Sequence, residues 1–471
     1  MARSAQGVLK FLYTCLPDTP VYAGAALSAL PPADDAEERI SALPFSLLRN
    51  IVSRLPAKDA ARATALSRRW RPVWRCTPLA FADALLLPGV LGAHRDHARA
   101  DTPALAGTFS RAIVDTFSRA IAAHPGPFRA VRLVCGYYAD AARQRQLARW
   151  VQSFVAMGIQ ELILVNRPWP LDSQSGADVL FPLLRELVLC SMVVESSDMN
   201  FLLVGSPVLE NFGIVGIREK AMRLRLVGQH LRCAQILMSA MDSIAVVDTP
   251  SLERLILCES KACNSSCIRL KIGKAPKLRI LGYLSPGIHM LEIQNTVINA
   301  GIKVTPSTMV PGIKILGLNV RLGVCNDSKM LPTFLRCFPN VETLHIVSRK
   351  TNKVTGRINL KFWQEAGPIE SIRSSIKMMT FREFGMERSE VAFLKFFFQS
   401  AHVLKNAVIV GSNESSTSIP EVINKLKTLI PENGPSNSCH VLVYESSDPG
   451  GAALSLQKGF DFSVSDPLKY R

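Results

Sequence analysis

The stretch FPLLRELVL, at residues 181–189, decides the fold because close copies of it recur through the middle of the chain. Each copy has Pro, any residue, an aliphatic residue, two mostly polar positions and then Leu or Phe. The copies are FPLLRELVL (181–189), SPVLENFGI (206–214), TPSLERLIL (249–257), APKLRILGY (275–283), VPGIKILGL (310–318) and FPNVETLHI (338–346). Apolar residues three and then two apart suit a turn followed by a short strand, with the residues between them directed to solvent.

The spacing of these copies predicts a stack of repeats. The prolines lie 25 to 43 residues apart, and weaker units without the full pattern stand at 159–164 and 231–236. A period of 20–29 residues with this Leu pattern is the leucine-rich-repeat signature, and one such unit cannot bury its apolar face alone. We expect an irregular solenoid; an ordinary α/β or all-β domain with coincidental Leu spacing is the alternative. Outward positions that could meet a partner are Arg185, Glu186, Glu210, Glu253, Arg254, Lys314, Glu342 and His345.

A compact helical unit is predicted before the repeats. In the first helix, after Leu43-Pro44, the apolar residues fall on one face and Pro56 ends the helix. A short Ala-rich helix at 59–66 follows, and Ser67 could cap a third helix with two Trp four residues apart. Three helices of this length bury little surface, so we expect the unit to need a partner or a neighbouring domain.

The stretch RISALPFSLLRNIVSRLPAKDAARATALSRRWRPVWRCTPLAFAD, about a tenth of the chain, resembles the F-box of plant proteins. The resemblance implies binding to the Skp-family linker of an SCF ubiquitin ligase and, through it, to a cullin. The linker-binding residues that it implies are Leu43, Pro44, Leu47, Leu48, Ile51, Leu55, Trp70 and Trp74. Two departures from the family pattern are Phe45-Ser46, where acidic residues are usual, and Pro72 early in the third helix.

The C-terminal region is predicted to form a strand, a helix and a strand. Met378, Thr380 and Phe381 suggest the first strand, and Ser389 could cap the helix that precedes the strand at 407–410. EVAFLKFFFQSAHVLKNAVIV (390–410) resembles the FBD domain, which follows F-box and leucine-rich repeats in one plant family. We expect this region to cap the solenoid, followed by a helix at 419–429 and a last strand at 440–444.

These patterns together predict an α/β chain with a three-helix F-box, a leucine-rich-repeat solenoid and a strand-helix-strand FBD cap. The expected divisions are a variable lead-in (1–38), the F-box (39–84), the repeats (85–370), the FBD-like cap (371–445) and a loose tail (446–471).

Composition limits the function classes. The chain has 471 residues, 48% of them hydrophobic, with a net charge of +17, of which +7 lies on residues 39–84 and +9 is spread over 181–370. This charge predicts an acidic partner: an acidic linker, an acidic substrate or, as a rival, nucleic acid. Eleven scattered Cys favour the reduced cytoplasm or nucleus, and no apolar run is long enough to span a membrane.

No catalytic or cofactor motif stands out. Cys258, Cys263, Cys267 and His289 have spacings that suit no common zinc site, and neither a phosphate-binding loop nor a serine-hydrolase motif is present. We therefore expect a non-catalytic adaptor without metal or cofactor that holds an unknown, possibly acidic, protein substrate, with no membrane partner. The alternatives are a basic nucleic-acid-binding protein and a stand-alone repeat scaffold.

Overall fold

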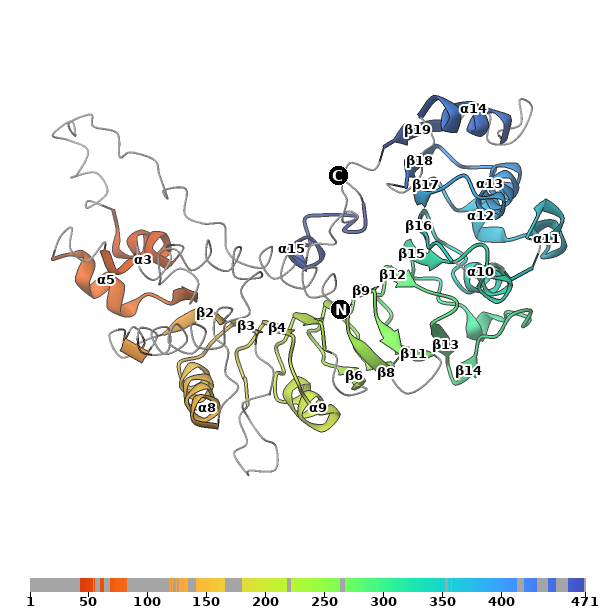
Figure 1. The fold of residues 1–471 in the computed structure, drawn as a ribbon. Helices are drawn as coiled ribbons and strands as arrows, with labels where there is room; N and C mark the ends of the chain where they lie inside the picture. The colour runs from red at the N-terminus through yellow and green to blue at the C-terminus, as the bar shows by residue number, and fades with distance from the viewer. Residues whose placement is uncertain are drawn as a thin grey trace, which may run out of the picture. The chain divides into compact units, whose positions relative to one another are not determined.

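The computed structural model is mixed α/β (Figure 1). It describes residues 43–53, 55, 60–62, 68–82, 115, 118–119, 121, 124, 127–133, 141–165, 180–217, 222–262, 267–351, 355–356, 358–412, 419–429, 439–445 and 456–469. The predicted lead-in at 1–38 lies outside these residues. The chain divides into two compact units, residues 1–219 and 220–471, which are described in turn.

The first unit joins two short helices to a parallel sheet. The helices are α3 (Phe45–Ser53) and α5 (Trp70–Cys76), and residues 60–62 are helical between them. The sheet has the order β1-β2-β3-β4-β5, with strands β1 (Leu79–Ala82), β2 (Phe128–Leu133), β3 (Glu161–Val165), β4 (Glu186–Cys190) and β5 (Asn211–Val215). Two further helices are α8 (Ala141–Ala156) and α9 (Ser196–Val204).

The second unit has a long parallel sheet, which we call the front sheet. Its strands, in spatial order, are β7 (Cys233–Leu237), β9 (Arg254–Cys258), β12 (Ile280–Leu284), β15 (Ile315–Val320), β16 (Thr343–Ser348), β17 (Met378–Phe384), β18 (Asn406–Gly411) and β19 (His440–Tyr444). The helices after β15 are α10 (Cys325–Cys337), α11 (Leu360–Glu365), α12 (Glu370–Ser374), α13 (Arg388–Ser400) and α14 (Ile419–Leu429), and a 3-10 turn, η3, spans Pro306–Thr308. These helices cover one side of the sheet, and α15 (Leu456–Phe460) lies on the other (Figure 1).

A second sheet replaces helices in the earlier repeats of this unit. Its strands are β6 (Met222–Val227), β8 (Ala240–Asp248), β10 (Lys261–Ala262), β11 (Ile268–Lys274), β13 (His289–Ile293) and β14 (Thr296–Val297). Only the β13–β14 pair is antiparallel among the pairings described here. In the repeats that contain β8, β11 and β13, the chain therefore passes from one front-sheet strand to the next through a strand of the second sheet. Farther along the chain, this connection is a helix.

The repeat pattern predicts the strands closely. Strands begin four residues after the repeat prolines, as in Pro182 before Glu186 and Pro339 before Thr343. In the first five full copies the residue before Pro accepts a hydrogen bond from the aliphatic residue three positions on, such as Leu252 N–H to Thr249 O at 3.1 Å. Pro at the second position of such a turn has its φ already set. The predicted solenoid of parallel strands is thus confirmed.

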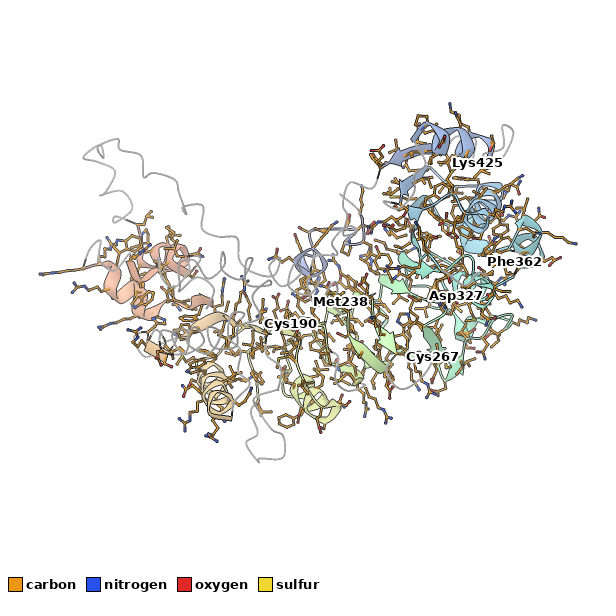
Figure 2. The ribbon with its side chains drawn as sticks, in the orientation of Figure 1. Cys190, Met238, Cys267, Asp327, Phe362 and Lys425 are labelled. Atoms are coloured by element: carbon orange, nitrogen blue, oxygen red, sulfur yellow. The ribbon has the colours of Figure 1, made fainter. Side chains whose placement is uncertain are left out.

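The C-terminal strand-helix-strand unit is also confirmed, with one change at its helix start. Helix α13 begins at Arg388, earlier than Ser389 would place it, and Glu390 Oε2 accepts hydrogen bonds from the backbone N–H groups of Gly385 (2.9 Å) and Glu387 (3.0 Å). Phe393 packs edge-on against Trp363, with ring centroids 5.1 Å apart. Arg321, after β15, forms an ion pair with Asp327 of α10 at 2.7 Å. Asp327 is labelled in Figure 2.

The C-terminal tail corrects the sequence prediction. Residues 446–471 are expected to be loose, but Leu456 and Leu468 are buried against the front sheet. We call residues 456–469 the C-terminal segment. Its contacts are with strands more than 100 residues away, so local sequence patterns do not reveal them.

Candidate functional site

An apolar strip on α3 is exposed. Leu47 and Ile51, one helical turn apart, keep 50% and 40% of their surface accessible, and Pro44 at the helix start is also exposed. We call these three residues the docking strip. The Pro44 carbonyl accepts hydrogen bonds from the N–H groups of Leu47 (3.0 Å) and Leu48 (3.1 Å), so it belongs to the first helical turn. Leu43 and Leu55 are half-buried at either end of the helix.

The adjacent face of α3 forms the core of the small helical unit. Leu48 is fully buried and Val52 is 1% exposed, while Trp70 and Val73 of α5 are buried as well. Arg69 Nη2 donates to the Leu43 carbonyl at 2.8 Å and joins the start of α5 to the start of α3. Leu48 and Trp70 therefore act inside the unit, which corrects their assignment as surface contacts for a linker.

Trp74 lies between the helical unit and the first strands. Its ring meets His124 edge-on at a centroid distance of 4.6 Å, and His124 meets Phe128 of β2 at 5.1 Å. Phe128 in turn contacts Phe154 of α8 at 5.8 Å. Burial lowers the pKa of His124, which favours the neutral ring in this aromatic row. Trp74 thus joins the helices to the repeats, a role that sequence reasoning did not assign to it.

The small helical unit that carries the docking strip also has exposed cations. Arg49 of α3 and Arg71 and Arg75 of α5 are exposed. Phe45, at the other edge of the buried face, is 45% exposed and is the one apolar surface residue of this helix that the sequence reasoning did not include among the contacts. A unit with an exposed apolar strip and exposed cations suits a partner that has both an apolar patch and acidic groups.

The repeats carry ion pairs between neighbouring strands. Arg232 binds Glu253 at 2.7 Å, and Glu342 binds both Lys314 (3.0 Å) and Lys377 (2.8 Å). The hydrogen bonds from Lys377 and Lys314 lower the pKa of Glu342 and keep it ionised. Carboxylates therefore oppose several cations of the repeat region; in the first unit, Arg185 and Glu210 pair in the same way at 2.6 Å.

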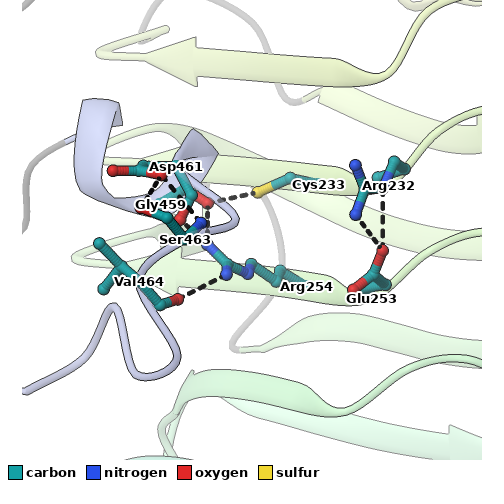
Figure 3. Close-up of polar contacts among 8 residues, drawn as sticks. All are labelled: Arg232, Cys233, Glu253, Arg254, Gly459, Asp461, Ser463 and Val464. Atoms are coloured by element: carbon teal, nitrogen blue, oxygen red, sulfur yellow. Dashed lines mark hydrogen bonds and ion pairs between the residues drawn. The ribbon is translucent and has the colours of Figure 1, made fainter.

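Two of the predicted outward positions are covered. Arg254 and His345 lie on the front sheet but are 4% and 1% exposed, because the C-terminal segment lies over them. Figure 3 shows its contacts with Arg254. Burial alone would raise the pKa of Asp466 in that segment. The hydrogen bond and charge of His345 outweigh burial, together with the N–H of Leu468 and the charge of Lys458, and the pKa of Asp466 is lowered. Asp466 is therefore held as a carboxylate.

The described residues contain neither a metal-ligand cluster nor a membrane-spanning helix. In that part of the chain there is no group of three or more His, Cys, Asp or Glu that could hold a metal ion, and Cys263 lies outside it. Burial raises the pKa of Cys258 to about 12, so this thiol stays protonated. No helix within the described ranges is long and apolar enough to cross a membrane.

Comparison with known proteins identifies three regions. Residues 40–79 match the F-box domain, residues 172–346 match the LRR repeats of FBD-associated F-box protein At5g56370, and residues 364–409 match the FBD. At3g58820 of Arabidopsis thaliana, named as an F-box protein, is 24% identical over 423 residues, covering 85% of this chain and 94% of its own. FBD-associated F-box protein At4g13985 of the same plant is 23% identical over 261 residues, covering 50% of this chain and 54% of its own.

The matched regions follow one another in the order in which the structure places α3 and α5, the parallel repeats and the α13 unit. A shorter likeness of higher identity, 48% over 46 residues, is to the F-box/FBD/LRR-repeat protein At5g22700 of Arabidopsis thaliana, covering 10% of each chain. The chain thus combines an F-box, leucine-rich repeats and an FBD domain, the combination named in these plant F-box proteins.

Proposed function

We propose that this F-box protein is the substrate-recognition subunit of an SCF-type ubiquitin ligase. In this role α3 docks on a Skp-family linker, the linker joins a cullin, and the repeats hold a protein substrate. The observation that carries the proposal is the docking strip of Pro44, Leu47 and Ile51, which remains exposed beside a buried face in the region that matches the F-box domain.

The burial pattern of α3 supports this assignment. Leu48 and Val52 already form the buried face of α3, so the exposed Leu47 and Ile51 are not needed for the core of the unit. Burying apolar surface contributes about 25 cal/mol per Å², so an exposed Leu-Ile pair favours association with a partner. The exposed Arg residues of α3 and α5 give this unit a positive surface, which favours an acidic partner.

In this proposal the repeats hold and position the substrate and do not take part in the chemical step. A substrate held on a rigid array has its lysines at a raised local concentration near the conjugating enzyme. The chain then contributes no catalytic step and needs no cofactor. The cytoplasm and the nucleus are its proposed locations, on the basis of the eleven unclustered Cys in the sequence.

The nucleic-acid alternative has weaker support. Several cations of the repeat region face carboxylates, as Arg232 faces Glu253 and Lys314 faces Glu342. Phosphate binding would have to displace these carboxylates from their partners. A stand-alone scaffold would leave the docking strip without a partner.

Co-purification of the full chain with a Skp-family linker tests the proposal. We expect a stable complex at moderate salt, and weak nucleic-acid binding that falls with salt without base preference. A chain that binds nucleic acid tightly and fails to retain the linker would refute the proposal.

A further inference from the structure

The C-terminal segment is held on the front sheet by its main chain. Arg254 of β9 donates hydrogen bonds to three of its carbonyl oxygens: Gly459 (2.8 Å), Asp461 (2.9 Å) and Val464 (2.7 Å) (Figure 3). Gln235 of β7 donates to the Leu456 carbonyl at 2.9 Å. Contacts to carbonyl oxygens hold a backbone path and do not depend on which side chains the segment carries.

Two side chains of the segment fit the sheet specifically. Leu468 is 2% exposed and packs in a cluster with Ile256, Tyr283 and Val347. The space for it depends on small residues, since a Cβ added to Gly317 would lie 3.1 Å from Leu468 Cδ1 and 2.8 Å from the Tyr283 ring. Nearer to β7, the ring of Phe462 lies under two guanidinium groups, 3.6 Å from Arg232 Cζ and 4.5 Å from Arg254 Cζ.

Asp466 contacts both the sheet and the backbone of its own segment. One carboxylate oxygen, Oδ2, lies 2.9 Å from His345 Nε2 of β16, while Oδ1 accepts the N–H of Leu468 at 3.0 Å. The same residue thus binds the sheet and shapes the turn that presents Leu468. Asp461 forms a similar turn by accepting the N–H of Ser463 at 2.9 Å.

The character of this surface is that of a ligand-binding site. A sheet face closed only for stability can be wholly apolar, whereas here an Arg, a Gln and a His alternate with an apolar cluster, and each polar side chain meets a polar atom of the segment. Directed polar contacts around an apolar anchor provide specificity in binding sites. The segment is joined to β19 through only eleven residues, so it acts at a high local concentration.

We propose that this face of β7, β9, β12, β15 and β16 is a peptide-binding site whose resident ligand is the C-terminal segment. Its protein partner, in this proposal, presents the same turn: an aromatic residue, Asp four positions later and Leu two positions after that. The aromatic ring takes the Phe462 position, the carboxylate takes that of Asp466, and the Leu fills the space beside Gly317. This inference rests on the proposed function. It names the kind of substrate segment that the site would bind, and it identifies the C-terminal segment as the part of the chain that blocks the site until a substrate displaces it.

A fluorescent peptide with the sequence of residues 455–471 tests the proposal by anisotropy on full-length chains. In the intact chain the resident segment competes with the added peptide at an effective concentration on the order of 1 mM. If the segment and the peptide each bind the site with a dissociation constant of about 10 µM, this competition weakens the apparent affinity of the peptide by roughly 100-fold. The double substitution Asp466→Asn and Leu468→Ala removes the two specific contacts of the resident segment. We expect the peptide to bind this variant far more tightly than the wild type.

Matched control variants show whether the peptide binds at the proposed face of the sheet. Ser465→Ala, at an exposed position of the same segment, should leave the wild-type behaviour unchanged. Adding Gly317→Ala to the double variant should abolish peptide binding, and a peptide carrying the Leu468→Ala change should not bind. Linker co-purification on the same chains reports the proposed function separately, since it depends on α3.

Three results would overturn the proposal. Equal peptide affinity for the wild type and the double variant would show that the segment does not occupy the site. No binding to a folded double variant would show that the face accepts no peptide in trans. Loss of folding in both the double variant and the single variant Asp466→Asn would show that the segment is a fixed part of the fold.

Discussion

Histidine 289 should make the second unit sensitive to mild acid. Its ring is 4% exposed at the start of β13, and its Nδ1 accepts the N–H of Ser285 at 2.8 Å. Burial lowers its pKa from 6.5 to about 4. Because the folded pKa is below the unfolded pKa, the neutral ring stabilises the fold above pH 6.5, and this contribution is lost as the pH falls towards 4.

The size of the effect follows from the shift. One pKa unit corresponds to about 1.4 kcal/mol, so the free energy of unfolding should fall by about 2 kcal/mol between pH 8 and pH 5, and by about 3 kcal/mol at pH 4. The substitution His289→Asn keeps an acceptor near the Ser285 N–H but does not titrate. In this variant the free energy of unfolding should therefore no longer show the fall of about 2 kcal/mol between pH 8 and pH 5 that His289 causes.

Hydrogen–deuterium exchange during urea unfolding measures this locally, through peptides that cover residues 268–293. A local probe is needed because a chain with two compact units is not expected to unfold in one step. His402→Asn, at an exposed position, is the matched control and should keep the wild-type pH dependence. An identical loss of stability at pH 5 in wild type and His289→Asn would refute the reasoning.

Three further predictions concern packing. Leu48→Ala should destabilise the helical unit by about 2–5 kcal/mol, while Leu47→Ala should cost less than about 0.5 kcal/mol; exchange of α3 amides measures both, and equal costs would contradict the burial pattern. Trp74→Leu should lose about 0.5–1.5 kcal/mol of ring packing with unchanged linker affinity, so weaker linker binding in a folded variant would return Trp74 to the interface. Glu390→Ala should cost about 1–3 kcal/mol by leaving two backbone N–H groups without their acceptor, and Glu390→Gln should recover most of it in thermal unfolding; no difference between these variants would exclude the capping role.

Local patterns made most of the fold predictable. Pro at the start of each turn and aliphatic residues at fixed offsets act within one repeat, so the strands after Pro182 and Pro339 could be placed from sequence. The helix at Ile419–Leu429 and the strand at His440–Tyr444 also appear as expected, because their apolar periodicity is local. The return strands β8, β11 and β13 were not predicted, since their use in place of helices depends on how neighbouring repeats stack.

The candidate sites were only partly predictable. Periodicity identified the apolar residues of α3 but could not tell that Leu48 is buried while Leu47 is exposed. The C-terminal segment escaped prediction for a different reason: its contacts join residues such as Arg254 and Gly459, 205 positions apart. Asp461 and Asp466 each form a turn by accepting a nearby backbone N–H, but nothing local in the sequence indicates the sheet beneath them.

Calorimetric titration of full-length chains with a purified Skp-family linker tests the central claim most directly. The decisive variant is Leu47→Glu with Ile51→Glu, which places two carboxylates on the docking strip without touching the buried core. Leu183→Glu, at a repeat residue of similar exposure (51%), is the matched control. We predict that the wild type and Leu183→Glu bind the linker alike and that the double variant, still folded, loses binding by more than about 100-fold. Undiminished binding by the folded double variant would contradict the account.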